Sequence, residues 1–267
     1  MIPAPATEFR AAWTHSHRIE DPEDIFSRMA AGGLNAAIMR VRRGETAYFD
    51  SKLGPLVQLP FDNDNFMEET IAAADRHGID LHAYVNNFPI GQPKSDYAQQ
   101  LRPQGRWQKD PDGNDLEWMC PSEPPNVELV KQAMVELARE YPVKGVQYDF
   151  IRYPSDRGCY CDRCRAKFEE RIGKQVENWP QDVLRDGALY EEYTDARCEH
   201  ITNAVRITSA AIREVNPDIV ISAAVFAQDP EQARHGAGQD WLRWCKEGLL
   251  DALCPMSYVY YTAAFGQ

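Results

Sequence analysis

The stretch GVQYDFIRYP, residues 145–154, decides the fold that we predict. It begins as an apolar run typical of a buried strand, and it ends by placing an aspartate, an arginine and a tyrosine before a proline. Side chains alternate along a strand, so Gln147 and Asp149 share one face while Val146 and Tyr148 share the other. The apolar face suits packing against helices. The polar face is then expected to point inward, with Asp149 at the carboxyl end of the strand.

Similar runs recur between amphipathic helical segments. The predicted strands cover residues 9–16, 35–42, 79–87, 143–151, 218–227 and 250–261. The first helix has clear boundaries, with Asp21 as N-cap, Pro22 at its first position and glycines 32 and 33 at its end. Strands that alternate with helices imply a parallel sheet with helical crossovers.

Two architectures satisfy this alternation, a (β/α)₈ TIM barrel and a doubly wound sheet. The sequence has no glycine-rich phosphate turn after the first strand, which weakens the case for a nucleotide-binding doubly wound sheet. Long loops follow the second, third and fourth strands, as they do on the catalytic face of barrel enzymes. We therefore predict a single α/β domain over residues 1–267, a (β/α)₈ TIM barrel with a cysteine-rich loop insertion at about 155–165.

Only six of the eight βα units of a complete barrel are visible before Gln267. We expect either a barrel that stays open or a chain that lacks the C-terminal units of a full barrel. An open barrel would expose strand edges, and the oligomeric state stays open.

Composition excludes several kinds of partner. The formal net charge of −12 argues against nucleic acid, whose binding depends on lysine and arginine, and against an anionic membrane surface. The sequence contains no apolar run long enough to span a membrane, and its first residues lack the features of a signal peptide. These features leave two locations open. The protein is either cytoplasmic, or secreted with its leader removed from this sequence.

Several segments together resemble the bacterial glycosyl-hydrolase-like family 10. They occur in the family's order and span nearly the whole chain: FRAAWTHS, RRGETAYFDSKLGP, AAADRHGIDLHAYVNNF, WMCPSEPPNVELV, GVQYDFIRYP with CYCDRC, and LDALCPMSY. The resemblance implies a (β/α)₈ barrel that acts on glycosidic bonds, with Asp149, Arg152 and Tyr153 in its site. The chain departs from the family at its C-terminus, where the last barrel strands are absent.

Glycoside cleavage usually needs two carboxylic groups. Asp149 is our first candidate, and Arg152 is expected to hold it ionised, which suits a nucleophile or charge stabiliser. The competing interpretation is a buried Asp–Arg pair that only fixes the loop. Asp240 is a local candidate for the second carboxylate, although its position before Trp241 favours a helix N-cap.

Three cysteines crowd into the segment CYCDRC, at positions 159, 161 and 164. Zinc sites use close thiolates on a tight loop, and Cys120 lies on a loop that could supply the fourth ligand. We expect a closed structural zinc site of Cys120, Cys159, Cys161 and Cys164, with no cofactor required for catalysis. Reduced thiols, or one disulfide with a leftover cysteine, are the alternatives.

Polar and aromatic side chains at or near the strand ends suit a sugar, which needs ring faces and hydrogen-bonding groups. The candidate substrate-binding residues are Trp13, His15, Arg40, Tyr48, His82, Asn86, Trp118, Tyr153, Met256 and Tyr258. For most of the aromatic residues, ordinary loop packing competes with this interpretation.

The sequence therefore predicts a glycoside hydrolase that cleaves the O-glycosidic bonds of a polysaccharide or cell-wall glycan, with Asp149 as its catalytic carboxylate. A carbohydrate-binding barrel without catalysis and a metal-dependent hydrolase that uses the cysteines are the alternatives.

Overall fold

Six parallel strands form the centre of the fold, one for each predicted strand. The structure is a computed structural model that describes residues 8–54, 56–227 and 229–258. The strands are β1 (Ala11–His15), β2 (Ala36–Arg43), β5 (Asp80–Asn86), β8 (Gly145–Asp149), β9 (Val220–Phe226) and β10 (Ala252–Met256). The end of the sixth predicted strand, residues 259–261, lies outside the described residues.

The order of these strands distinguishes the predicted TIM barrel from a doubly wound sheet. Each strand pairs in parallel with the next one along the chain, from β1 through β2, β5, β8 and β9 to β10. A doubly wound sheet reverses direction at a switch point, whereas a barrel winds in one direction. The chain therefore has the strand order of a TIM barrel. Within the described residues β1 and β10 do not pair, so no closed barrel is formed.

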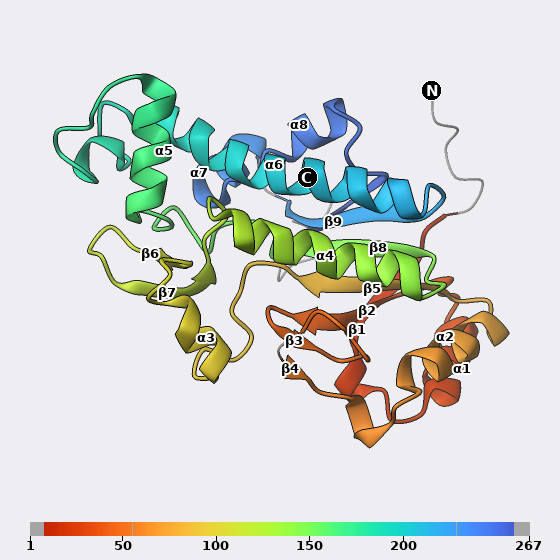
Figure 1. The fold of residues 1–267 in the computed structure, drawn as a ribbon. Helices are drawn as coiled ribbons and strands as arrows, with labels where there is room; N and C mark the ends of the chain where they lie inside the picture. The colour runs from red at the N-terminus through yellow and green to blue at the C-terminus, as the bar shows by residue number, and fades with distance from the viewer. Residues whose placement is uncertain (1–7, 55, 228, 259–267) are drawn as a thin grey trace.

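Helices cover the outer face of this sheet (Figure 1). They are α1 (Pro22–Ala31), α2 (Phe66–Arg76), α4 (Pro124–Glu140), α6 (Tyr190–Val215) and α8 (Trp241–Lys246), while α7 (Pro230–Ala237) follows the end of β9 and packs against α6. The expected start of α1 is confirmed, because the Asp21 side chain accepts hydrogen bonds from the amides of Glu23 and Asp24. Tyr148 on β8 is buried and its hydroxyl lies 3.0 Å from Ser209 on α6, so the apolar face of β8 packs against helices as predicted.

Additional elements gather at the carboxyl ends of the strands (Figure 1). They are β3 (Thr46–Ala47), β4 (Leu56–Val57), α3 (Asp96–Leu101), β6 (Trp107–Lys109), β7 (Asp115–Met119) and α5 (Asp162–Ile172). Short 3-10 helices occupy Ser16–Arg18, Pro60–Asp62 and Gln181–Val183. The β6–β7 hairpin lies in the segment 88–125, for which the sequence predicted only a long loop.

Two groups of buried apolar side chains stabilise the fold. The larger one runs through the sheet and its helices, and it includes the β6–β7 hairpin and the clustered cysteines. The smaller one lies around α5 and consists of Tyr160, Phe168, Val176, Val183, Tyr193 and Ala196. The cysteine-rich insertion thus has a small core of its own that extends well past residue 165. No described helix is both long and apolar enough to cross a membrane.

Candidate active site and cysteine cluster

Asp149 is the last residue of β8, and the backbone turns sharply directly after it. Phe150 has a φ angle of 51°, in the left-handed region that non-glycine residues rarely occupy. Asn87 holds this turn, because its backbone amide and its side-chain Nδ2 each donate to the Asp149 carbonyl at 2.9 Å. The amide of Phe150 in turn donates to Asp149 Oδ1 at 2.8 Å. Asn87 therefore fixes the backbone at Asp149, and the Phe150 amide holds its carboxyl group at the rim of the sheet.

Burial has the largest effect on the pKa of this carboxyl group. Removal from water raises the pKa of Asp149 to about 6, and the Phe150 amide, Arg152 and Arg40 oppose this shift only in part. A carboxyl group with a pKa of about 6 keeps its proton over much of the mildly acidic range. This upward shift is opposite in direction to the one that a partner Arg152 was expected to cause, since a guanidinium paired with the carboxylate would lower its pKa.

The position of Arg152 explains the difference. Among the described residues Arg152 forms no ion pair, and its Nη1 donates to the carbonyls of Tyr153 and Pro154 at 3.0 and 3.3 Å. Its guanidinium carbon lies 5.2, 4.8 and 4.9 Å from the ring centroids of Trp118, Phe150 and Phe226, respectively. The expected Asp149–Arg152 ion pair is therefore wrong, because the long side chain turns into a box of aromatic rings beside the carboxylate.

Polar groups of the neighbouring strands surround Asp149. Asn86 is in register with Asp149, and its Oδ1 is buried with no hydrogen-bond partner among the described residues. Tyr84 lies on the same face one step earlier, and burial together with the Asp149 charge raises the pKa of its phenol to about 12. Tyr84 was not among the candidate residues from the sequence, although its alternation with His82 and Asn86 placed it in the same inward stack.

A second polar group lies at the ends of β1 and β2. Nη2 of Arg40 lies 3.5 Å from Nδ1 of His17, and its guanidinium carbon lies 5.9 Å from the ring centroid of Tyr48. The ring centroids of His15 and Tyr84 are 6.4 Å apart. Burial and the Arg40 charge lower the pKa of His15 to about 4, so this imidazole is neutral near pH 7. The structure therefore brings His15, Arg40 and Tyr48 together, as predicted, and adds His17.

Two of the predicted residues lie lower in the sheet. Trp13 and His82 are both in register with Ile38, and His82 is in register with Gly145, four residues before Asp149. Four strand residues correspond to about 13 Å, so neither side chain belongs to the rim. The position of Trp13 and His82 argues against direct contact with a sugar bound at Asp149.

Tyr153 is buried completely and is not available to a ligand. Its hydroxyl lies 3.1 Å from Nδ1 of His200, and the guanidinium of Arg197 lies 4.7 Å from its ring centroid. The resemblance and its position near the strand end placed Tyr153 in the site, but the strand ends at Asp149 rather than at Ile151 and the Tyr153 side chain enters the core. Its expected role in substrate binding is therefore wrong.

The remaining predicted contacts differ in exposure. Trp118 on β7 is half-buried, and its ring centroid lies 5.6 Å from that of Phe150. Met256 ends β10 in register with Phe226 of the aromatic box, and Tyr258 is 85% exposed. Trp118 is thus part of the aromatic box around Arg152, Met256 pairs with Phe226 of that box, and Tyr258 is exposed to solvent.

Asp240 has a structural role. Its Oδ1 accepts a hydrogen bond from the Arg243 amide at 3.2 Å and caps α8, while its Oδ2 lies 4.0 Å from Nε of Arg234. This is the N-cap that the sequence favoured over a catalytic function.

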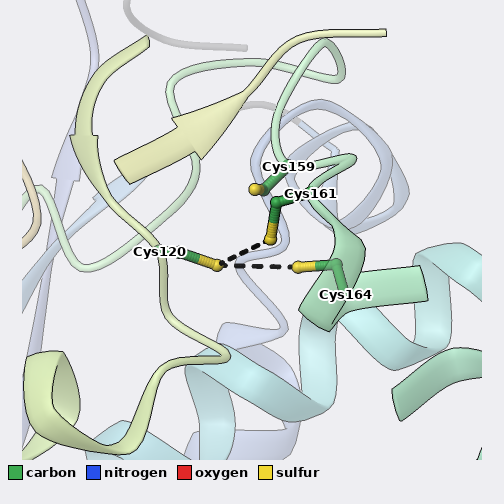
Figure 2. A group of neighbouring side chains, drawn as sticks. All are labelled: Cys120, Cys159, Cys161 and Cys164. Atoms are coloured by element: carbon green, nitrogen blue, oxygen red, sulfur yellow. Dashed lines mark hydrogen bonds between the residues drawn. The ribbon is translucent and has the colours of Figure 1, made fainter. Parts of the chain in front are cut away.

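The four predicted cysteine ligands come together (Figure 2). The sulfur atoms of Cys120, Cys159, Cys161 and Cys164 all lie within 4.8 Å of one another, and all four residues are buried. The Cys120 sulfur lies 3.8 Å from that of Cys161 and 3.6 Å from that of Cys164. Tetrahedral zinc with bonds of about 2.3 Å requires sulfur atoms about 3.8 Å apart. All four cysteines are free in this structure, so the cluster could bind a metal.

The polar surroundings of the cluster also suit a metal. The Lys109 amide donates to the Cys159 sulfur at 3.3 Å, and the Ser122 hydroxyl lies 3.1 Å from the Cys120 sulfur and 3.3 Å from the Cys164 sulfur. Such contacts orient and stabilise metal-bound thiolates. The four cysteines fit a metal ion better than they fit a purely apolar core.

Comparison with known proteins identifies the family. The sequence profile of the family described as glycosyl hydrolase-like 10 matches residues 8–267. The chain belongs to this family. A curated relative, an S-layer-related protein of Niallia circulans, is 26% identical over 191 residues, which cover 60% of this chain and 12% of that protein. The match therefore involves only a small part of this much longer relative.

Solved structures confirm the fold of the family member. The PgaB (BpsB) glycoside hydrolase domain of Bordetella bronchiseptica matches with a TM-score of 0.69 and 15% identity, covering 94% of this chain and 74% of that chain. A β-galactosidase of Marinomonas ef1 matches with a TM-score of 0.67 and 10% identity, covering 94% of this chain and 41% of that chain. At these identities the similarity shows the fold alone, a domain of the TIM-barrel type found in glycoside hydrolases.

Proposed function

We propose that this chain is a glycosidase in which Asp149 donates a proton to the oxygen of the scissile O-glycosidic bond. The observation that carries the proposal is the fixed carboxyl group at the carboxyl end of β8, whose pKa is raised to about 6 by burial. A general acid needs a pKa near the working pH, and glycosidases obtain it by burying the acid. Family membership supports the reaction class.

The surrounding groups suit a sugar. The aromatic box of Trp118, Phe150 and Phe226 offers apolar ring faces, and it fixes Arg152 in place. Asn86 has a buried amide oxygen without a partner among the described residues, which a sugar hydroxyl would satisfy. We propose that these residues bind the sugar next to the scissile bond, with Tyr84, His15, Arg40, Tyr48, Met256 and Tyr258 around them.

We assign a structural zinc ion to the cluster of four cysteines. Four thiolates fill a tetrahedral site and leave no position for a water molecule, so the metal would take no part in hydrolysis. Cys120 follows Trp118 by two residues, and Cys159 lies on the loop that leads away from Asp149. The ion would therefore fix the hairpin and the loop that form the aromatic box. This geometry opposes a metal-dependent hydrolase.

A second candidate function is binding of a glycan without cleavage. Its support is that Asp240, the candidate for a second catalytic carboxylate, instead caps α8. Glycosidases usually position two carboxylic groups around the bond. The S-layer-related relative fits either function for a protein at the cell surface.

The experiment that separates the two candidates is hydrolysis of a glycan panel by the wild type and by Asp149→Asn. The panel contains de-peptidated peptidoglycan strands, plant polysaccharides, β-galactosides and α-L-fucosides. Asp240→Asn is the matched control, because asparagine caps a helix as well as aspartate does. We expect products from the wild type and the control only. Glycan binding by all three proteins without product would favour the second function.

A further inference from the structure

The cysteine cluster is not equally shielded on all sides. Cys120, Cys159 and Cys164 are 0% exposed, whereas Cys161 is 8% exposed. Cys161 lines a groove of about 830 Å³, whose other walls include Trp107, Tyr160 and Ala166. Among the four sulfur-bearing residues, Cys161 alone lines this groove. Cys161 is therefore the cluster residue that lies nearest to solvent.

Local structure also makes Cys161 the reactive member. It is the N-cap of α5, which spans Asp162–Ile172, so the positive end of the helix dipole lies at this residue. The first turns of this helix, with Asp162, Arg163 and Ala166, also line the groove. The nearest sulfur for which a contact is seen, that of Cys120, lies 3.8 Å away and can reach a disulfide bond length with a small movement.

We propose that Cys161 is the site at which peroxide oxidises the cluster and releases its metal. The Cys161 thiolate attacks hydrogen peroxide, the O–O bond breaks, and a sulfenic acid and hydroxide form. The Cys120 thiolate then attacks the Cys161 sulfur, the S–O bond breaks, and a disulfide and a second hydroxide form. The two thiolates lose two electrons, which the peroxide gains. The site keeps two thiolates, and the zinc ion leaves.

This reaction would regulate the site around Asp149. Cys120 follows Met119, the last residue of β7, and Trp118 on that strand packs against Phe150 and Arg152. Loss of the metal would free the hairpin that carries Trp118, and the aromatic box would loosen. The inference rests on the proposed metal site, and its chemical part is independent of the proposed glycosidase activity.

The test uses the zinc-loaded chain, whose metal content is measured first. Hydrogen peroxide is added in steps, released zinc is followed with a chromogenic chelator, remaining thiols are blocked, and disulfides are mapped by mass spectrometry. We expect one zinc ion released for each disulfide formed, with Cys161 joined to Cys120. The exposed Cys245 serves as an internal reference for the extent of oxidation.

Cys161→Ser removes the proposed site of oxidation, but this variant also removes a ligand of the cluster. If it fails to fold, a second variant that changes only the wall of the groove keeps the test informative. Ala166→Leu adds bulk to the groove wall on α5 without removing a ligand, and leucine suits a helix. We expect it to slow zinc release several-fold while Cys245 oxidises at its usual rate. A first disulfide that lacks Cys161, or zinc release as fast in Ala166→Leu as in the wild type, would overturn the proposal. A chain that binds no zinc would overturn its metal step, while mapping still identifies the first thiol oxidised.

Discussion

Replacement of Asp149 by asparagine should stabilise the folded protein at neutral pH while it abolishes turnover. Burial raises the pKa of Asp149 from 3.8 to about 6, so the folded state holds this proton over a pH range in which the unfolded chain has released it. Stability therefore falls as the pH rises from about 4 to about 6, and it stays reduced above that range. Asparagine cannot ionise, and its side-chain oxygen can still accept the Phe150 amide hydrogen bond.

The size of the effect follows from the pKa shift. A difference of about two pH units at about 1.4 kcal/mol each gives about 3 kcal/mol at most. The Asp149→Asn variant should therefore match the wild type near pH 3.5 and exceed its free energy of unfolding by up to about 3 kcal/mol at pH 7.5. Urea unfolding followed by circular dichroism at both pH values measures this difference, and the subtraction at each pH cancels the titration of all other groups.

Asp240→Asn is again the control, because it makes the same chemical change at a helix N-cap. An Asp149→Asn variant that is equally or less stable than the wild type at pH 7.5 would refute the account of a buried, destabilised carboxylate. A stabilised variant that retains full hydrolysis would refute the catalytic assignment and leave the burial account intact.

Three further predictions concern the same region. The kcat/KM of the wild type should fall about tenfold per pH unit above pH 6, as Asp149 loses its proton, and a pH–rate profile that is flat to pH 8 would contradict the general-acid function. Cys164→Ser should lower the zinc content and the Tm together, as measured by elemental analysis and calorimetry, and an unchanged Tm with lost zinc would exclude a structural role for the metal. Tyr153→Phe should cost about 1 kcal/mol of stability through the lost contact with His200 and leave kcat/KM unchanged, which urea unfolding and steady-state kinetics check.

Much of the fold was predictable because strand pairing depends on local patterns. The six apolar runs became six parallel strands, and the alternation in β8 correctly placed Val146 and Tyr148 toward the helices. Cys120 was also found from sequence, since a barrel brings the loop after one strand next to the following strand. The β6–β7 hairpin was not predicted, because its short strands carry mixed polar and apolar side chains.

Side-chain directions at the rim were predictable only where the strand continued. Up to Asp149 the alternation applies, and Asn86 and Asp149 lie side by side as neighbours in register. The positive φ of Phe150 ends the alternation, so Tyr153 points into the core rather than toward a ligand. Arg152 is next to the carboxylate in sequence, yet its flexible side chain is stabilised by aromatic rings that come from β7 and β9, which local sequence does not reveal.

The most direct measurement is product formation from the glycan panel by purified wild type, Asp149→Asn and Asp240→Asn at pH 5.5. The account predicts cleavage of at least one glycan by the wild type and by Asp240→Asn, with turnover by Asp149→Asn lowered by at least about a hundredfold. Equal cleavage by Asp149→Asn and the wild type would contradict the assignment of Asp149. Binding of a glycan with no cleavage by any of the three proteins would contradict glycosidase activity for this chain.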